Sequence, residues 1–281
     1  MSNIPWLLYN LITMKEILIN PEIDKYKTEL TTAIEAVQTA GRVILDQENN
    51  RKAKRYSLEF KSEVDNLADV AGIEVIKKYF PGDNVLTEEQ EIPKNISGRL
   101  WVADLLDGTT NFLNGSRNYS VLLSFVENGK LKVGVSYLPV TDELFYAIDG
   151  QGAYLNGKKI HVSTTDFDKS TVIIDPGYDP KGIEKTAKLM MELRPKIGNI
   201  AMYNANGYTL SMLAKGELSG LVHFYSKIWE SAGFLLVKEA GGKITDKNGK
   251  ELELNFGSSE GFQFVASNGL IHEELLKTKG L

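Results

Sequence analysis

The sequence of 281 residues contains no cysteine. This absence excludes disulfide bonds, thiolate nucleophiles, and zinc or iron–sulfur sites built from cysteine. It also favours a reducing compartment, and we expect a cytoplasmic protein. Histidine is scarce as well, because the sequence has three, His161, His223 and His272, which stand far apart. A metal site built from histidines is therefore not expected, whereas ions that prefer oxygen ligands remain open.

The sequence has neither a net positive charge nor a long hydrophobic run. Its formal net charge of −5 argues against a protein that binds nucleic acid polymers, since these usually carry a basic face. The apolar runs in residues 1–23 are too short to span a bilayer, and no basic segment precedes them. We treat residues 1–23 as an N-terminal extension, within which Met14 is an alternative start, and we expect no membrane partner.

Hydrophobic periodicity predicts an α+β half over residues 24–160. A helix is expected over 24–47, with Asp24 as its cap, and a second over 66–79, with a polar loop or hairpin at 49–61 between them. From residue 100 onward, β-rich runs are joined by Asn-Gly pairs at 128–129 and 156–157, which predict hairpins. The stretch 152–159 also fits a phosphate-loop pattern, but its context favours the hairpin.

The pattern changes to an α/β half over residues 161–281. Strands are expected at "STVIID", "GLVHFY" and "GFQFVASN", and helices near 181–193, 206–216 and 230–240. The composition, with 42% hydrophobic residues, supports a sizeable core for one large domain or two smaller ones. The domain boundary is predicted near residue 160.

Acidic residues gather at the ends of apolar runs. They are Glu88, Glu89, Asp104, Asp107 and Glu230, with Asp69 in the predicted second helix. Carboxylates and carbonyl groups are the ligands that Mg²⁺ or Mn²⁺ prefers. Carboxylates that converge on one point repel each other unless cations lie between them. The alternative is that each acid is a helix cap or a solvated loop residue.

The turn that follows Asp107 indicates what such a site would bind. Gly108 permits a tight turn, and the free N–H groups at a helix start can hold phosphate oxygens. A threonine hydroxyl beside metal ions, such as that of Thr109, can position and help deprotonate a water molecule. Two metal ions with an activated water are a recurring apparatus for hydrolysing phosphate esters.

Four segments stand out in this order along the sequence: "KSEVDNLAD" at 61–69, "TEE" at 87–89, "DLLDGTTNF" at 104–112 and "WESAGFLLVKEAGG" at 229–242. Together they resemble the inositol monophosphatase family of Mg²⁺-dependent, often lithium-sensitive phosphatases. The resemblance runs from about residue 24 to near the C-terminus. It implies a layered αβαβα sandwich of the inositol monophosphatase and fructose-1,6-bisphosphatase type, a homodimer, and a small phosphorylated substrate. It also implies on the order of two or three Mg²⁺ ions, with Mn²⁺ as a substitute and Li⁺ as an inhibitor.

The resemblance assigns roles to particular residues. It implies a first Mg²⁺ bound by Glu88, Asp104 and the Leu106 carbonyl, and a second bound by Asp104, Asp107 and Glu230. It implies a catalytic group of Thr109, Asp69 and Glu88, with Thr109 and Asp69 activating the attacking water. The candidate substrate-binding residues are Gly108, Thr109, Thr110, Asn206, His223 and Lys227.

Departures from the family pattern keep several functions open. Leu105 replaces a usual proline, Glu230 replaces a usual aspartate, and His223 occupies the position of an acid that contacts inositol hydroxyls. We expect a phosphomonoesterase acting on a sugar or polyol phosphate similar to inositol monophosphate. Alternatives are a dual fructose-1,6-bisphosphatase/inositol monophosphatase and a 3′(2′),5′-bisphosphate nucleotidase, although the latter usually has lysine where Thr110 stands. A member that has lost catalysis and serves as a binding or regulatory subunit is a further alternative.

Overall fold

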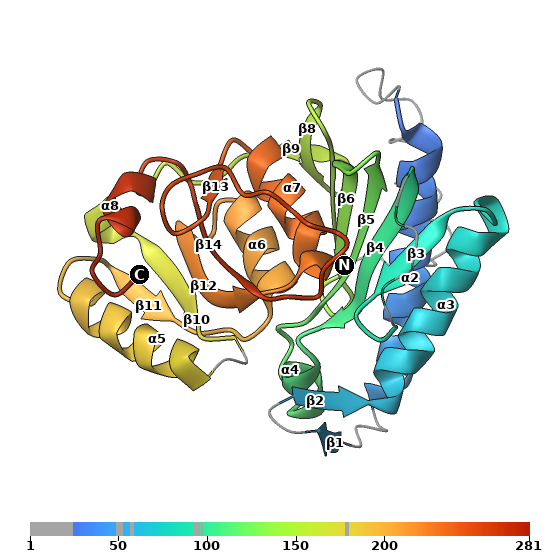
Figure 1. Cartoon of the computed structure of the whole chain (residues 1–281), viewed down its shortest axis with the longest axis horizontal. Helices are drawn as coiled ribbons and strands as arrows, with labels where there is room; N and C mark the ends of the chain where they lie inside the picture. The colour runs from blue at the N-terminus through green and yellow to red at the C-terminus, as the bar shows by residue number, and fades with distance from the viewer. Residues whose placement is uncertain are drawn as a thin grey trace, which may run out of the picture.

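The computed structural model describes residues 25–48, 53–56, 59–90, 92, 96, 98–177 and 180–281. The N-terminal extension and the predicted cap Asp24 lie outside these residues. Two β-sheets and the helices between and around them form the body of the molecule (Figure 1). No helix in these ranges is both long enough and apolar enough to cross a membrane.

The first sheet has seven strands in the order β3-β4-β5-β6-β7-β8-β9, with β3 and β4 parallel and the other neighbours antiparallel. The strands are β3 (Asn84–Thr87), β4 (Arg99–Asp107), β5 (Ser120–Glu127), β6 (Lys130–Leu138), β7 (Glu143–Ile148), β8 (Gly152–Leu155) and β9 (Lys158–Ile160). Both predicted Asn-Gly hairpins are confirmed, because Asn128 and Asn156 have the positive φ that such turns require.

The second sheet has five strands in the order β11-β10-β12-β14-β13. They are β10 (Thr171–Asp175), β11 (Asn199–Ala201), β12 (Gly220–Ser226), β13 (Lys243–Thr245) and β14 (Phe262–Ser267). Strands β11, β10 and β12 are parallel, and β14 pairs antiparallel with β12 and β13. The sequence did not predict β11 and β13, because three residues are too few for an alternating pattern to show.

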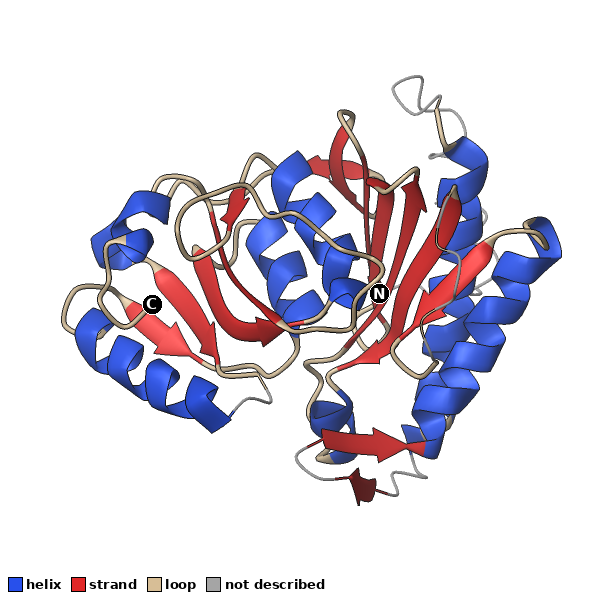
Figure 2. Ribbon diagram, viewed as in Figure 1, coloured by secondary structure: helices blue, strands red, loops and turns tan. Residues whose placement is uncertain are grey.

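The helices complete five layers, so the αβαβα expectation is confirmed (Figure 2). Helices α2 (Lys27–Asp46) and α3 (Glu63–Tyr79) cover the outer face of the first sheet, and α6 (Asn206–Ala214) and α7 (Ser231–Glu239) lie between the sheets. Helices α5 (Pro180–Leu193) and α8 (His272–Leu276) cover the outer face of the second sheet. The short elements are β1 (Ala53–Tyr56), β2 (Glu59–Ser62), α4 (Thr109–Leu113), η2 (Phe167–Lys169) and η3 (Ile228–Glu230).

Two helix starts differ from the expectation. Helix α2 begins at Lys27, and its cap position is Tyr26, which has a φ of 63° and makes no side-chain capping bond. Helix α3 begins at Glu63 instead of residue 66. The earlier start of α3 places Asp65 on the helix. Glu63 and Asp65 lie in its first turn, where their negative charges interact favourably with the positive end of the helix dipole. Asp65 is thereby fixed relative to the sheet.

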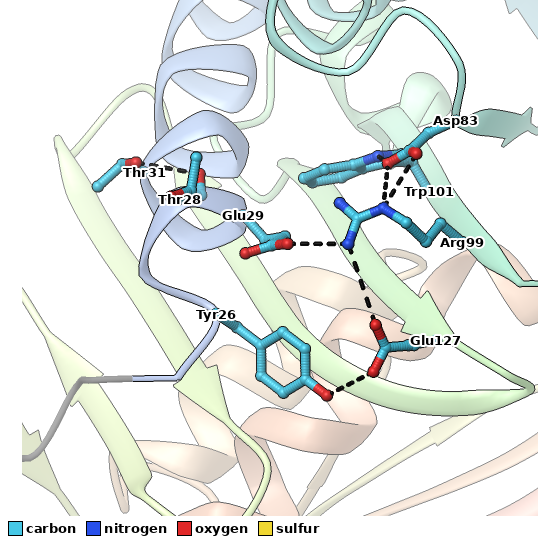
Figure 3. Close-up of polar contacts among 8 residues, drawn as sticks. All are labelled: Tyr26, Thr28, Glu29, Thr31, Asp83, Arg99, Trp101 and Glu127. Atoms are coloured by element: carbon cyan, nitrogen blue, oxygen red, sulfur yellow. Dashed lines mark hydrogen bonds and ion pairs between the residues drawn. The ribbon is translucent and has the colours of Figure 1, made fainter.

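An arginine ties α2 to the first sheet (Figure 3). The Nε of Arg99 donates to both carboxylate oxygens of Asp83 at 3.0 Å, and its Nη1 donates to Glu29 at 3.0 Å. The indole of Trp101 donates to the same Asp83 carboxylate at 2.9 Å. The guanidinium also lies over the Phe125 ring, 4.5 Å from its centroid. This junction fixes α2, the start of β3 and the start of β4 together.

Candidate active site

A cavity of about 450 Å³ opens where β3 and β4 end and where α4, α6 and α7 begin. The polar residues that line it include nearly all the candidates from the sequence. They are Glu88, Glu89, Asp104, Asp107, Thr109, Thr110, Asp175, Asn204, Asn206, His223, Lys227 and Glu230. A volume of this size accommodates a small phosphorylated metabolite.

Thr109 is paired with Asp65 and not with Asp69. The Thr109 hydroxyl lies 2.7 Å from Oδ1 of Asp65 and 3.1 Å from the carbonyl oxygen of Leu106. Asp69, which the sequence analysis paired with Thr109, instead accepts a hydrogen bond of 2.5 Å from the buried hydroxyl of Thr87. The structure therefore joins Thr109 to Asp65, in place of the Asp69 that the sequence analysis named. One helical turn separates the two acids, and the start of α3 sets which one faces Thr109.

Asp104 is a buried acid that lies close to four other carboxylates of the site. Its side chain is 7% exposed, and one of its oxygens accepts the N–H of Leu106 at 3.1 Å. The pKa of Asp104 is raised well above its ordinary value, first by burial and then by the negative charges of Glu88, Asp107, Glu230 and Asp65. These carboxylates are thus close enough to repel each other, as the sequence analysis anticipated for converging acids.

The N-terminus of α6 supports the neighbouring Asp107. Its Oδ2 accepts the hydroxyl of Ser120 at 2.7 Å and the N–H of Tyr208 at 3.1 Å. Burial raises the pKa of Asp107 to about 6, and these hydrogen bonds counteract part of that rise. Asp107 is therefore held in one orientation by an element that belongs to the layer between the sheets.

Glu230 is held by two side chains that the sequence did not connect with it. Its Oε2 accepts the amide of Asn206 at 2.9 Å and the hydroxyl of Ser226 at 2.5 Å. Burial raises the pKa of Glu230 to about 8, against the effect of these two donors. Asn206, which was predicted to bind substrate, thus contacts Glu230, and its own buried Oδ1 has no hydrogen-bond partner among the described residues.

The donor set fits a hard divalent cation. The acids offer oxygen atoms; Asp104, Asp107 and Glu230 are buried and Glu88 is partly exposed, and positive charge between them would relieve their mutual repulsion. Within the ranges that the structure describes, however, no three or more His, Asp or Glu side chains are arranged so that they could hold a metal ion together. Asn206 and Ser226 orient the Glu230 carboxylate within this set of acids.

The turn from β4 into α4 is closely packed. Gly108 has a φ of +85°, and a side chain there would meet Ala205 at 2.9 Å and the carbonyl oxygen of Asn118 at 3.0 Å. The amide of Asn111 donates to the carbonyls of Asn118 at 2.7 Å and Tyr203 at 2.6 Å. These contacts fix the first turn of α4, whose N–H groups have no acceptor within the helix.

Comparison with known proteins places this arrangement in a family. The model of the inositol monophosphatase family matches residues 25–279. The chain belongs to the inositol monophosphatase family. It is 33% identical over 230 residues to the fructose-1,6-bisphosphatase/inositol-1-monophosphatase of Thermotoga maritima, covering 82% of this chain and 86% of that protein. It is 32% identical over 256 residues to the Nus factor SuhB of Pasteurella multocida, covering 88% and 94%.

Solved structures of the inositol monophosphatase family share the fold. An IMPase of Thermotoga maritima aligns with a TM-score of 0.79 and 29% identity, covering 89% of this chain and 96% of that one. The extragenic suppressor protein suhB of Bartonella henselae aligns with a TM-score of 0.82 and 26% identity, covering 90% and 100%. The proteins similar to this chain therefore include some named as phosphatases and some named Nus factor SuhB or extragenic suppressor protein suhB.

Three residues of this family member's site were missed in the sequence. Asp65 lies in the segment "KSEVDNLAD", where Asp69 was chosen in its place. Asp175 ends the apolar strand β10, so the rule that selected Asp104 would also have selected it. Ser226 carries no signal of its own, because a serine at the end of a strand is common.

Proposed function

We propose that this protein is a Mg²⁺-dependent phosphomonoesterase that hydrolyses a small sugar or polyol phosphate with an activated water. The observation that supports this most is the Thr109–Asp65 hydrogen bond of 2.7 Å beside a cluster of mutually repelling carboxylates in one cavity. Membership of the inositol monophosphatase family supports the same function. A homodimer remains part of the proposal.

Thr109 and Asp65 would transfer a proton during the reaction. Because the Thr109 hydroxyl donates to Asp65, its oxygen lone pairs can accept a hydrogen bond from a water molecule. As the water oxygen forms its bond to phosphorus, a proton of the water passes to Thr109 while the proton of Thr109 passes to Asp65. The bond between phosphorus and the ester oxygen breaks without a covalent enzyme intermediate, the leaving oxygen takes a proton from solvent water to become the alcohol, and Asp65 returns its proton to the solvent.

Other residues would bind the phosphate and the cations. The N–H groups at the start of α4 and the hydroxyl of Thr110 would hold phosphate oxygens in the turn that Gly108 makes possible. Mg²⁺ would be held by Glu88, Asp104, the Leu106 carbonyl, Asp107 and Glu230, and would supply charge neutralisation and activation of water.

The test is phosphate release by the purified chain with Mg²⁺ and with EDTA. The panel contains inositol 1-phosphate, fructose 1,6-bisphosphate, adenosine 3′,5′-bisphosphate and an aryl phosphate. We expect release with Mg²⁺, none with EDTA, and a matched loss in Asp104→Asn. Release that persists in EDTA or in Asp104→Asn would contradict the proposed mechanism.

A regulatory role is the second candidate, since relatives at 28–32% identity carry the name Nus factor SuhB. Glu230, whose side chain is one methylene longer than that of the usual aspartate, is the feature of this chain that favours weakened catalysis. This role predicts no turnover of any ester at high Mg²⁺, and some turnover in Glu230→Asp. Normal turnover by the unmodified chain would show that Glu230 does not weaken catalysis, and would contradict this role.

A further inference from the structure

A second cavity lies at the end of the first sheet that is remote from the candidate active site. Strand β4 reaches the candidate active site with its last residue, Asp107, and its first residue, Arg99, pairs with Glu127 at the opposite end. Glu127 pairs in turn with Lys130, which lines the second cavity. The nine residues of β4 span about 25 Å, and the two cavities share no lining residue among those that the structure describes.

The walls of the second cavity are largely apolar. The start of β6, the second half of α7 and the segment from β13 to Phe256 enclose a volume of about 720 Å³, and α7 and β13 lie side by side (Figure 1). The apolar side chains that line it include Leu131, Phe234, Ile244, Leu252, Leu254 and Phe256. Leu131, Ile244 and both leucines of the last segment are only partly buried. The fold thus leaves apolar surface in a cavity of the size that binds small molecules, and a ligand that covers it gains free energy.

The charged residues of the second cavity are mostly cationic. They are Lys130, Lys132, Lys238 and Lys243, opposed by Asp149 and Glu251. The cavity therefore carries an excess of two positive charges in a chain whose formal net charge is −5. An excess of this sign favours an anionic ligand over a neutral or cationic one.

The two acids leave part of this positive charge unpaired. Asp149 accepts the Lys132 ammonium at 2.6 Å, and its other oxygen lies 3.9 Å from Lys238, so one carboxylate is shared by two lysines. Lys130 forms no ion pair within the described part of the chain, and Glu251 is exposed. Lys130 on β6 and Lys238 on α7 are therefore the ammonium groups most available to a bound anion.

We propose that this second cavity is a binding site for a small amphipathic anion, a molecule with an apolar body and a carboxylate or similar group. The apolar body lies against Leu131, Leu252 and Phe256, and the anionic group contacts the ammonium groups of Lys130 and Lys238. The site goes beyond the proposed function, because it contains none of the residues to which hydrolysis is assigned.

The experiment titrates the full chain with 2-naphthoate and with 2-naphthamide by calorimetry, in EDTA. The two probes share an apolar body and differ in the negative charge. We expect 2-naphthoate to bind about tenfold more tightly, since two partly exposed ammonium groups face its carboxylate. Lys130→Gln/Lys238→Gln should bring the two probes to within about twofold of each other. Leu252→Trp, which fills part of the cavity, should weaken both probes by about fivefold or more once its melting temperature shows that it is folded.

Two controls locate the bound probe. Lys188→Gln/Lys277→Gln makes the same change of charge at lysines that are 61% and 67% exposed and do not line the cavity, and it should keep the tenfold difference. Lys227→Gln alters the candidate active site and should also keep it.

The proposal would be overturned by equal affinities of the two probes for the unmodified chain, or by no binding of either at millimolar concentration. Loss of binding in Lys227→Gln, or equal losses in the two double variants, would overturn it as well. None of these readouts requires turnover, so the result is independent of whether the protein hydrolyses an ester.

Discussion

The Thr109 hydroxyl donates a hydrogen bond of 2.7 Å to Asp65, which precedes it by 44 positions on a different element. Replacing Asp65 with Asn leaves the shape of the side chain but removes the proton acceptor. We expect kcat to fall by about 10²–10⁴-fold, as is typical for loss of a general base. Asp69→Asn, one helical turn away, is the control and should retain most of its kcat once folding is verified by circular dichroism. Equal losses in the two variants would contradict the assigned roles.

Asn206 and Ser226 should matter for cation binding more than for folding. They donate to Glu230 at 2.9 and 2.5 Å, and removing either donor frees a buried carboxylate from its fixed position. We expect Asn206→Ala to raise the apparent Kd for Mg²⁺ by about tenfold, measured from the rise of the melting temperature with Mg²⁺ concentration. Ser211→Ala, on the same helix but bonded to Ser136, is the control. An unchanged Mg²⁺ response in Asn206→Ala would count against this role.

The turn at Gly108 should not tolerate a side chain. Gly108→Ala combines a left-handed φ of +85° with contacts to Ala205 and Asn118, and we expect a loss of about 1–3 kcal/mol in the free energy of unfolding. Gly129→Ala is the matched control, because its φ is +74° but no atom lies within 4 Å of the added carbon. Urea unfolding gives the free energy of unfolding of both variants, and the difference between their losses is the steric part of the effect. Similar losses would show that the contacts of Gly108 with Ala205 and Asn118 are unimportant.

His272 should make the fold sensitive to acid. Its ring is buried between the hydroxyls of Thr245 and Ser267 at 2.9 and 2.8 Å, and burial followed by the charge of Lys243 lowers its pKa to about 4. A proton therefore binds the His272 ring more tightly in the unfolded chain than in the folded one. The stabilisation that the neutral buried ring provides is fully present above the ordinary histidine pKa of about 6.5. It is lost as the pH falls from there toward about 4.

The variant His272→Asn tests this pH dependence. It should be less stable than the unmodified chain at pH 7, since both ring hydrogen bonds change. Its free energy of unfolding should fall less steeply between about pH 6.5 and 4, measured by urea unfolding at a series of pH values. His161→Asn, which replaces an exposed histidine, is the control. A slope in His272→Asn as steep as that of the unmodified chain would contradict the role of the buried ring.

Local patterns in the sequence were enough to predict the hairpins and the main helices. The Asn-Gly turns at 128–129 and 156–157 need positive φ, and asparagine and glycine provide it. Strands β11 and β13 were missed because each has three residues and is defined by its partners in the sheet. The layered arrangement was expected from the family resemblance, and no single segment specifies it.

The sequence predicted most of the residues that line the cavity, but it did not predict which of them contact each other. Asp65 and Asp69 are both acidic, both buried and on one face of α3, so their spacing cannot tell which of them reaches Thr109. The start of α3 and its packing on β4 decide it, and both depend on the folded chain. The contact of Asn206 with Glu230 likewise joins residues 24 positions apart through the meeting of α6 and α7.

The two sheets of this protein contribute different parts of the cavity. The end of β4 in the first sheet leads into Thr109, and the end of β12 in the second carries His223 and Lys227. On the proposed function, a substitution in the second sheet that changes which molecule is bound need not disturb Thr109 of the first sheet. The two parts of the cavity can then change separately, so a protein with this architecture can acquire a new substrate while the residues proposed for hydrolysis stay as they are.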